Sequence, residues 1–147
     1  MTTLGTFHLA SSDDDMADKA VEWILSESFD FIFVDFDGPD AAGHSTGFEG
    51  YAKNYQNRFI STDVLVGKLL DAVLDTSSGE EWLIVVTSDH GGEGGGHGAD
   101  DLYNCKTPFM VASNSPRVNV GYMPLEDPGS QMADGCSSDH NALFRRS

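Results

Sequence analysis

The chain has 147 residues, enough for one domain with its own core, and 39% of them are hydrophobic, which excludes a disordered chain. There are 24 acidic residues against 8 basic ones, and the formal net charge of −16 makes a nucleic-acid or anionic-membrane partner unexpected. No apolar run approaches the roughly 20 residues of a membrane-spanning helix. The first ten residues lack a signal-peptide pattern, so we expect no membrane segment and the localisation stays open.

The first periodic segment of the chain follows three consecutive acids, Asp13-Asp14-Asp15. Apolar side chains then recur at steps of three and four residues from Met16 to Leu25. This spacing places them on one face of a helix, and short acidic side chains favour helix starts. The pattern predicts an amphipathic helix with an acidic N-cap.

Two apolar runs and a long helical pattern predict the centre of the fold. The run Phe29–Val34 is rich in aromatic and β-branched residues and predicts a buried strand. A helical stripe then extends from about Tyr51 to about Leu74, and Leu83–Thr87 predicts a second buried strand. Strand, long helix and strand in this order are typical of a right-handed crossover in a parallel sheet. We therefore expect an α/β fold with a mostly parallel sheet and flanking helices.

The C-terminal third of the chain is less regular. Phe109–Ala112 predicts a third short strand. Beyond Ser113, scattered Pro, Gly and Ser residues leave no periodic segment, so residues 114–147 are expected to form an irregular tail of a single domain spanning residues 1–147.

Acidic and imidazole side chains follow both central strands. Asp40 and His44 come after the first strand, and Asp89 and His90 come directly after the second. Because ligands gather outside the carboxyl ends of parallel strands, these four side chains are expected at one edge of the sheet. His97 adds a third imidazole from a glycine-rich loop. Carboxylate and imidazole together suit zinc and similar divalent cations, so the pattern predicts metal chemistry.

The combined motifs resemble those of the alkaline phosphatase superfamily, and most closely its type I phosphodiesterase and nucleotide pyrophosphatase branch. The resemblance is carried by Pro39-Asp40-x-x-Gly43-His44, Ser88-Asp89-His90-Gly91, and His97-Gly98 with Thr107-Pro108-Phe109, within Phe29–Ser113. It implies a partial alkaline-phosphatase-like sheet and metal-dependent hydrolysis of a small-molecule phosphodiester or phosphomonoester.

The resemblance also implies a division of the ligands between two divalent cations, zinc or alternatively manganese. Asp40, His44 and His97 would hold one cation. Asp89 and His90 would hold the other, together with an upstream Asp and a nucleophilic Thr or Ser. One cation would polarise a phosphoryl oxygen while the other activates the nucleophile.

The nucleophile itself is not found in this sequence. Nothing between Met1 and Asp30 offers a strand that ends in Asp with a Thr or Ser at the following helix start. No catalytic residue is therefore assigned, and the nucleophile is expected upstream. The chain is expected to be a C-terminal fragment of a larger catalytic domain, which makes the single domain over residues 1–147 incomplete.

Other functions remain open. Asp35-Phe36-Asp37-Gly38 also resembles the first motif of haloacid dehalogenase phosphatases, with Asp35 as nucleophile and Asp37 as general acid. Pro39 stands where that family has Thr, and the Asp89-His90 pair would have no role. Sulfatases, phosphomutases and phosphoethanolamine transferases share the metal scaffold of the preferred family. A non-catalytic metal-binding remnant is the alternative outside the enzymes.

Overall fold

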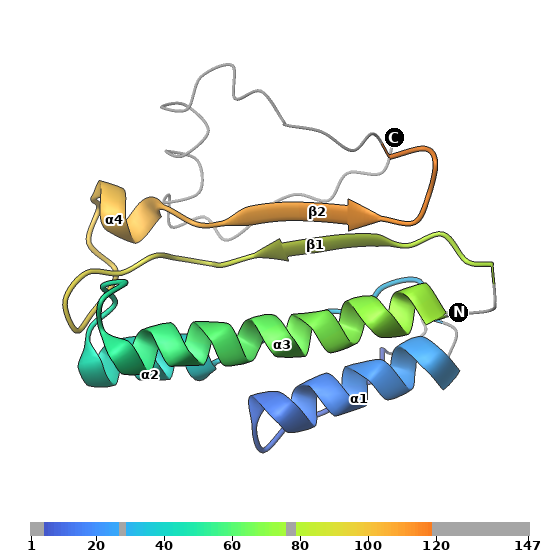
Figure 1. Ribbon diagram of the computed structural model, residues 1–147, viewed down its shortest axis with the longest axis horizontal. Coiled ribbons are helices and arrows are strands. Elements are labelled where there is room, and N and C mark those ends of the chain that lie inside the picture. The colour runs from blue at the N-terminus through green and yellow to red at the C-terminus, as the bar shows by residue number, and fades with distance from the viewer. Residues whose placement is uncertain (1–4, 27–28, 76–78, 119–147) are drawn as a thin grey trace.

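The computed structural model describes residues 5–26, 29–75 and 79–118 and shows an α/β arrangement in this part of the chain. Its elements are α1 (Asp13–Ser26), α2 (Gly38–Thr46), α3 (Lys53–Asp75), β1 (Leu83–Thr87), α4 (Leu102–Cys105) and β2 (Phe109–Ser113). The two strands lie side by side, α3 runs along β1, and α1 packs on the other side of α3 (Figure 1). The predicted α/β class is confirmed.

Helix α1 confirms the first predicted helix, but its cap is different from the one expected. Ala17, Ala20 and Ile24 form its buried face. Its N-terminus is capped by the hydroxyl of Ser12, which accepts a hydrogen bond from the Asp15 N–H at 3.2 Å.

The carboxylate of Asp13 caps another helix. It accepts the Gly38 N–H at 3.1 and 3.3 Å from its two oxygens. Gly38 begins α2, whose own N-cap residue, Asp37, makes no side-chain cap. Asp13 therefore fixes the start of α2 across 25 residues of sequence.

The hydrophobic core lies between α1, α3 and β1. Helix α3 confirms the long predicted helix and buries Leu65, Ala72 and Val73. Ile24, Ala72 and Val73 form a buried cluster. Partly buried side chains from both sequence neighbours and distant segments pack against it: Val21, Ile32, Leu69, Trp82 and Ile84. No helix in the described ranges is long and apolar enough to cross a membrane.

The pairing of the strands differs from the prediction. The strands at Leu83–Thr87 and Phe109–Ser113 lie where the sequence predicts them, but they pair antiparallel, with Leu83 opposite Ser113 and Thr87 opposite Phe109. They are consecutive in the chain and no long crossover helix separates them, so antiparallel pairing is the accessible arrangement. The expected parallel sheet is therefore wrong for the residues that the structure describes.

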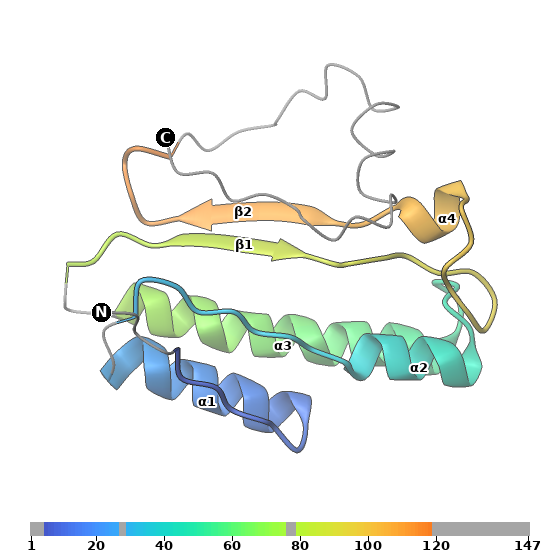
Figure 2. The ribbon, with the colours of Figure 1, turned by 180° about the vertical axis from the view of Figure 1, so that it is seen from behind.

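The predicted strand at Phe29–Val34 is also absent from the described sheet. This segment is extended and passes along α3 before it enters α2 (Figure 2). Ile32 contacts the core, whereas Phe31 and Phe33 on the alternate face are largely exposed. A buried parallel strand needs cover on both faces, and only one face is covered here.

The predicted irregular tail is described only in part. Residues 114–118 contain no helix or strand, as expected, and residues 119–147 lie outside the described part of the chain.

Candidate metal centre

Helix α2 presents the first two predicted ligands on one face. Pro39 occupies its first turn, where the fixed φ of proline is already helical and no N–H is needed. Asp40 and His44 are four residues apart, so their side chains are neighbours on the helix surface. The helix ends at Gly47, whose φ of +99° favours glycine and whose N–H donates to the Gly43 carbonyl at 2.7 Å.

The third predicted ligand, His97, follows a tight turn of the glycine track, which we call the glycine turn (Glu93–Gly96). Glu93 and Gly96 exchange backbone hydrogen bonds of 3.1 and 3.2 Å, and Gly94 inside the turn has a φ of +57°. His97 follows the turn directly. The position of the turn therefore determines where the His97 imidazole lies.

Donor atoms of three residues converge beside α2. His44 Nε2 lies 3.1 Å from His97 Nε2 and 3.5 Å from Asp40 Oδ2. His97 Nε2 lies 3.5 Å from Asp40 Oδ1. One ligand atom from each of these residues lies within 4.8 Å of the others. The structure thus brings Asp40, His44 and His97 together, although 53 residues separate the two histidines.

The chemistry of these donors fits a divalent cation. Asp40 Oδ1 is buried and has no hydrogen-bond partner, which is costly for a carboxylate unless a positive charge is nearby. His44 Nδ1 lies 3.0 Å from the Gly95 carbonyl and must donate to it, which leaves the lone pair of the neutral ring on Nε2. Two nitrogens on one tetrahedral zinc lie roughly 3.3 Å apart, close to the spacing of His44 and His97.

His90 reaches the same cluster from the end of β1. Its Nδ1 lies 2.7 Å from the Gly91 carbonyl, so the lone pair of the neutral ring is again on Nε2. That Nε2 is 3.9 Å from Asp40 Oδ1 and 3.7 Å from Asp89 Oδ2. The structure therefore places His90 beside the cluster, while the Asp89 side chain remains 88% exposed.

The orientation of the His90 ring separates it from the other two imidazoles. It stacks on His97 with centroids 3.7 Å apart and an angle of 17° between the planes. A coordinated cation lies in the plane of its imidazole ligand, and one cation cannot lie in both of two nearly parallel planes. His90 and His97 in this arrangement therefore face two adjacent positions.

Two aromatic side chains border the cluster. Phe48 is buried and meets the rings of His44 and His97 edge to face at centroid distances of 5.4 and 6.0 Å. Tyr55 packs against Phe48 at 5.4 Å. Burial raises the pKa of the Tyr55 phenol, and the negative charge of Asp40 raises it further. The ligands therefore have an apolar wall on this side.

The sequence interpretation missed Phe48 and Glu49, which connect α2 to the glycine turn. Glu49 Oε1 accepts the Gly94 N–H at 2.9 Å, and the Phe48 N–H donates to the Gly94 carbonyl at 2.8 Å. Their only signal in the sequence is position: an aromatic residue and an acid follow Gly47 directly, opposite a glycine track that has no side chains of its own.

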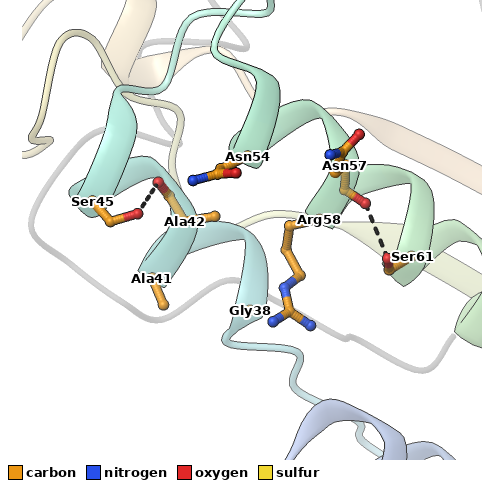
Figure 3. A pocket seen from close by; sticks show the side chains of 8 residues that line it. All are labelled: Gly38, Ala41, Ala42, Ser45, Asn54, Asn57, Arg58 and Ser61. Carbon is orange, nitrogen blue, oxygen red and sulfur yellow. Dashed lines mark hydrogen bonds between the residues drawn. The ribbon is translucent and has the colours of Figure 1, made fainter.

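Other residues named from the sequence lie away from the cluster. Asp35 and Asp37 are exposed in the segment that precedes α2. On another face of α2 is a polar pocket of about 510 Å³, with Arg58 of α3 extending toward Gly38 (Figure 3). Its lining residues are Gly38, Ala41, Ala42, Ser45, Asn54, Asn57, Arg58 and Ser61. None of the predicted ligands lines this pocket.

Comparison with known families agrees with a metal centre. Residues 2–109 match the metalloenzyme superfamily, and the chain belongs to this superfamily. The predicted membership of the alkaline-phosphatase-like enzymes is thereby confirmed at the level of the superfamily. A candidate metal site is present at Asp40, His44 and His97.

Curated relatives of the chain include 2,3-bisphosphoglycerate-independent phosphoglycerate mutases. The chain is 31% identical to that of Clostridioides difficile over 77 residues, which is 52% of this chain and 14% of the relative. It is 29% identical to that of Onchocerca volvulus over 112 residues (71% and 20%) and to that of Clostridium botulinum over 123 residues (82% and 21%). The chain thus spans about a fifth or less of their length.

No solved structure matches the chain. The relatives are mutases, whereas the motif resemblance in the sequence is closest to type I phosphodiesterases. The superfamily is therefore secure, and the branch predicted within it is not supported by these relatives.

Proposed function

We propose that this chain forms the metal-ligating part of a phosphoryl-transfer enzyme similar to the phosphoglycerate mutases. The observation that carries the proposal is the convergence of the His44 and His97 Nε2 atoms on a carboxylate whose Oδ1 is buried without a hydrogen-bond partner. Similarity to mutases favours transfer of a phosphoryl group over its hydrolysis.

In this proposal Asp40, His44 and His97 hold one divalent cation, and Asp89 and His90 contribute to a second. The stacked His90 and His97 rings support two positions, since their lone pairs lie in separate planes. Zinc and manganese both suit imidazole and carboxylate donors. Bound cations would supply the positive charge that stabilises phosphoryl oxygens during transfer.

The residues of the chain have defined tasks toward such cations. The Gly95 and Gly91 carbonyls hold Nδ1 of His44 and His90, so that each ring keeps its Nε2 lone pair directed at the centre. Phe48 covers one side of the cluster and limits access of water to the ligands. None of these residues is the proposed nucleophile.

The proposed substrate is a small phosphorylated molecule, and phosphoglycerate is the first choice because of the relatives. The net charge of −16 would repel a phosphate ester from most of the surface. The substrate would therefore bind only where cations invert the local sign of the potential, next to Asp40.

A chimeric enzyme tests this proposal. The aligned 123 residues of the Clostridium botulinum relative are replaced by those of this chain, and interconversion of phosphoglycerate isomers is measured with manganese or zinc present. We expect mutase activity that disappears with His44→Ala in the same chimera. A chimera that is folded and loaded with metal but inactive would contradict the proposal.

Phosphodiester hydrolysis is the second candidate, because the motifs resemble those of type I phosphodiesterases. A chromogenic phosphodiester added to the same chimera and to the chain itself separates the two functions. Turnover of the diester without interconversion of phosphoglycerate would favour the hydrolase.

A further inference from the structure

We infer that Phe48 and Glu49 act as a clamp that positions the glycine turn, so that His97 reaches Asp40 and His44 before any cation binds. We call these two residues the Phe48–Glu49 clamp. The inference rests on the proposed function, because it concerns the third ligand of the proposed centre. It assigns a positioning role to residues that are not themselves ligands.

Two hydrogen bonds join the clamp to one residue of the turn. The Glu49 carboxylate accepts the Gly94 N–H at 2.9 Å, and the Phe48 N–H donates to the Gly94 carbonyl at 2.8 Å. Both polar groups of Gly94 are thus bound to the segment that follows α2. The next residue, Gly95, accepts a third bond from His44 Nδ1 at 3.0 Å. Three hydrogen bonds therefore hold the turn, and all of them involve the adjacent residues Gly94 and Gly95.

The ring of Phe48 fixes the distance between α2 and the glycine track. A Cβ on Gly43 would overlap this ring, and so would a Cβ on Gly92. Two glycines therefore make the space that the ring occupies, one on each side. Phe48 is only 8% exposed and also contacts both His44 and His97. A smaller side chain here would leave the turn without its apolar support.

The composition of the turn explains why a clamp is needed. Gly91 and Gly92 precede Glu93, and Gly94, Gly95 and Gly96 follow it, so this stretch loses more backbone freedom on ordering than a stretch of other residues would. Fixing each residue of this stretch costs conformational entropy. Because the clamp orders the turn in the folded chain, this entropy is lost on folding and not on cation binding. Without the clamp, the turn would lose this entropy when the cation binds, and the affinity for the cation would be weaker.

The experiment uses the full chain and three variants of matched size or charge. Glu49→Ala removes the acceptor of the Gly94 N–H, and Glu49→Gln keeps an acceptor oxygen without the charge. Glu93→Ala removes a neighbouring acid of the same turn whose side chain makes no described hydrogen bond. Zinc and manganese affinities are measured by calorimetry, and exchange of the Gly94 and Phe48 amide hydrogens is measured in the metal-free chain.

We expect Glu49→Ala to weaken cation binding by about 10- to 100-fold, as loss of a partner that orients ligands generally does. Glu49→Gln should retain most of the affinity, and Glu93→Ala should bind as the unmodified chain does. In the metal-free chain only Glu49→Ala should accelerate exchange at Gly94. A merely structural role would lower the stability of the chain without a selective effect at this amide.

Equal affinity for Glu49→Ala and Glu93→Ala would overturn the inference, and so would equal exchange at Gly94 in both. Equal losses of cation affinity in Glu49→Ala and Glu49→Gln would also overturn it, because the effect would then come from the negative charge of Glu49 and not from its hydrogen bond to Gly94. Absence of cation binding by the unmodified chain would instead contradict the proposed function. The exchange measurement would still test the clamp in that case.

Discussion

The metal centre and the sheet of this molecule are stabilised in different ways. At the centre, α2 and the glycine turn are joined by directional bonds across about 50 residues of sequence, around a buried Phe48. In the sheet, β1 and β2 pair only with each other among the described residues, and Leu83, Phe109 and Met110 are each more than half exposed. The arrangement of the ligands therefore depends on contacts within the centre and not on a complete sheet.

The largest expected effect is the loss of a ligand. His44→Ala should weaken zinc or manganese binding by more than the roughly 100-fold upper range for loss of a supporting partner, since a direct donor disappears. His8→Ala is the matched control, because His8 pairs with Asp15 of α1 at 3.3 Å. Calorimetric titration compares the two variants. Equal cation affinities of the His44→Ala and His8→Ala variants would show that His44 is not a ligand.

The second effect concerns the core on which α1 and α3 depend. Ile24→Ala should lower the free energy of unfolding by about 2–5 kcal/mol, because a buried side chain is replaced by a cavity. Leu25→Ala, at the adjacent and 54% exposed position of the same helix, should cost much less. Urea denaturation measures both variants. Similar losses would mean that α1 does not pack as described.

A smaller effect is expected where the Phe48 ring meets the glycine track. Gly92→Ala should lower the free energy of unfolding by about 1–3 kcal/mol, because the added Cβ overlaps the ring. Gly95→Ala serves as control, since its Cβ would lie 3.9 Å from its nearest neighbour, the His44 carbonyl oxygen. Urea denaturation measures the free energy of unfolding of both variants, and cation titration measures their affinity. A tolerated Gly92→Ala would contradict the tight contact.

The smallest effect is a pH dependence outside the centre. The Asp101 side chain accepts hydrogen bonds from the Asn104 side chain and from the backbone N–H groups of Asn104 and Tyr103. Hydrogen bonds from Asn104, ahead of the other causes, lower the pKa of Asp101 from its ordinary value of 3.8. Its contribution to stability is therefore present above pH 3.8 and is lost as pH falls through the lowered folded pKa.

Asp101→Ala should accordingly be less stable than the unmodified chain near neutral pH, with a difference that shrinks in acid. Denaturation over a pH series measures it, with the exposed neighbour Asp100→Ala as control. A difference that stays constant into strong acid would show that the Asp101 carboxylate is not the group responsible.

The sequence predicted the helices and strands well where a single face is buried. The spacing of apolar residues predicted α1 and α3, and short apolar runs predicted β1 and β2, whereas α2 and α4 were not predicted. It failed on strand pairing, because apolar content predicts burial but does not identify the neighbour of a strand. Phe29–Val34 has the composition of a buried strand, yet only one of its faces is covered.

The candidate ligands were predicted from residue type and from their place after the predicted strands, whereas the groups that contact them were not. Asp40 and His44 lie one turn apart on α2, a helix that was not predicted from the sequence. The contact of Glu49 with Gly94 joins a side chain to a backbone amide 45 residues away, and no local pattern encodes such a bond. Positioning residues of this kind become visible only in the folded chain.

Cobalt(II) titration of the full chain, followed by visible absorption, tests most directly whether Asp40, His44 and His97 hold one cation. We expect a saturable absorption band with imidazole ligation in the unmodified chain, and its loss in His97→Ala. An unchanged band and an unchanged affinity in His97→Ala would contradict it.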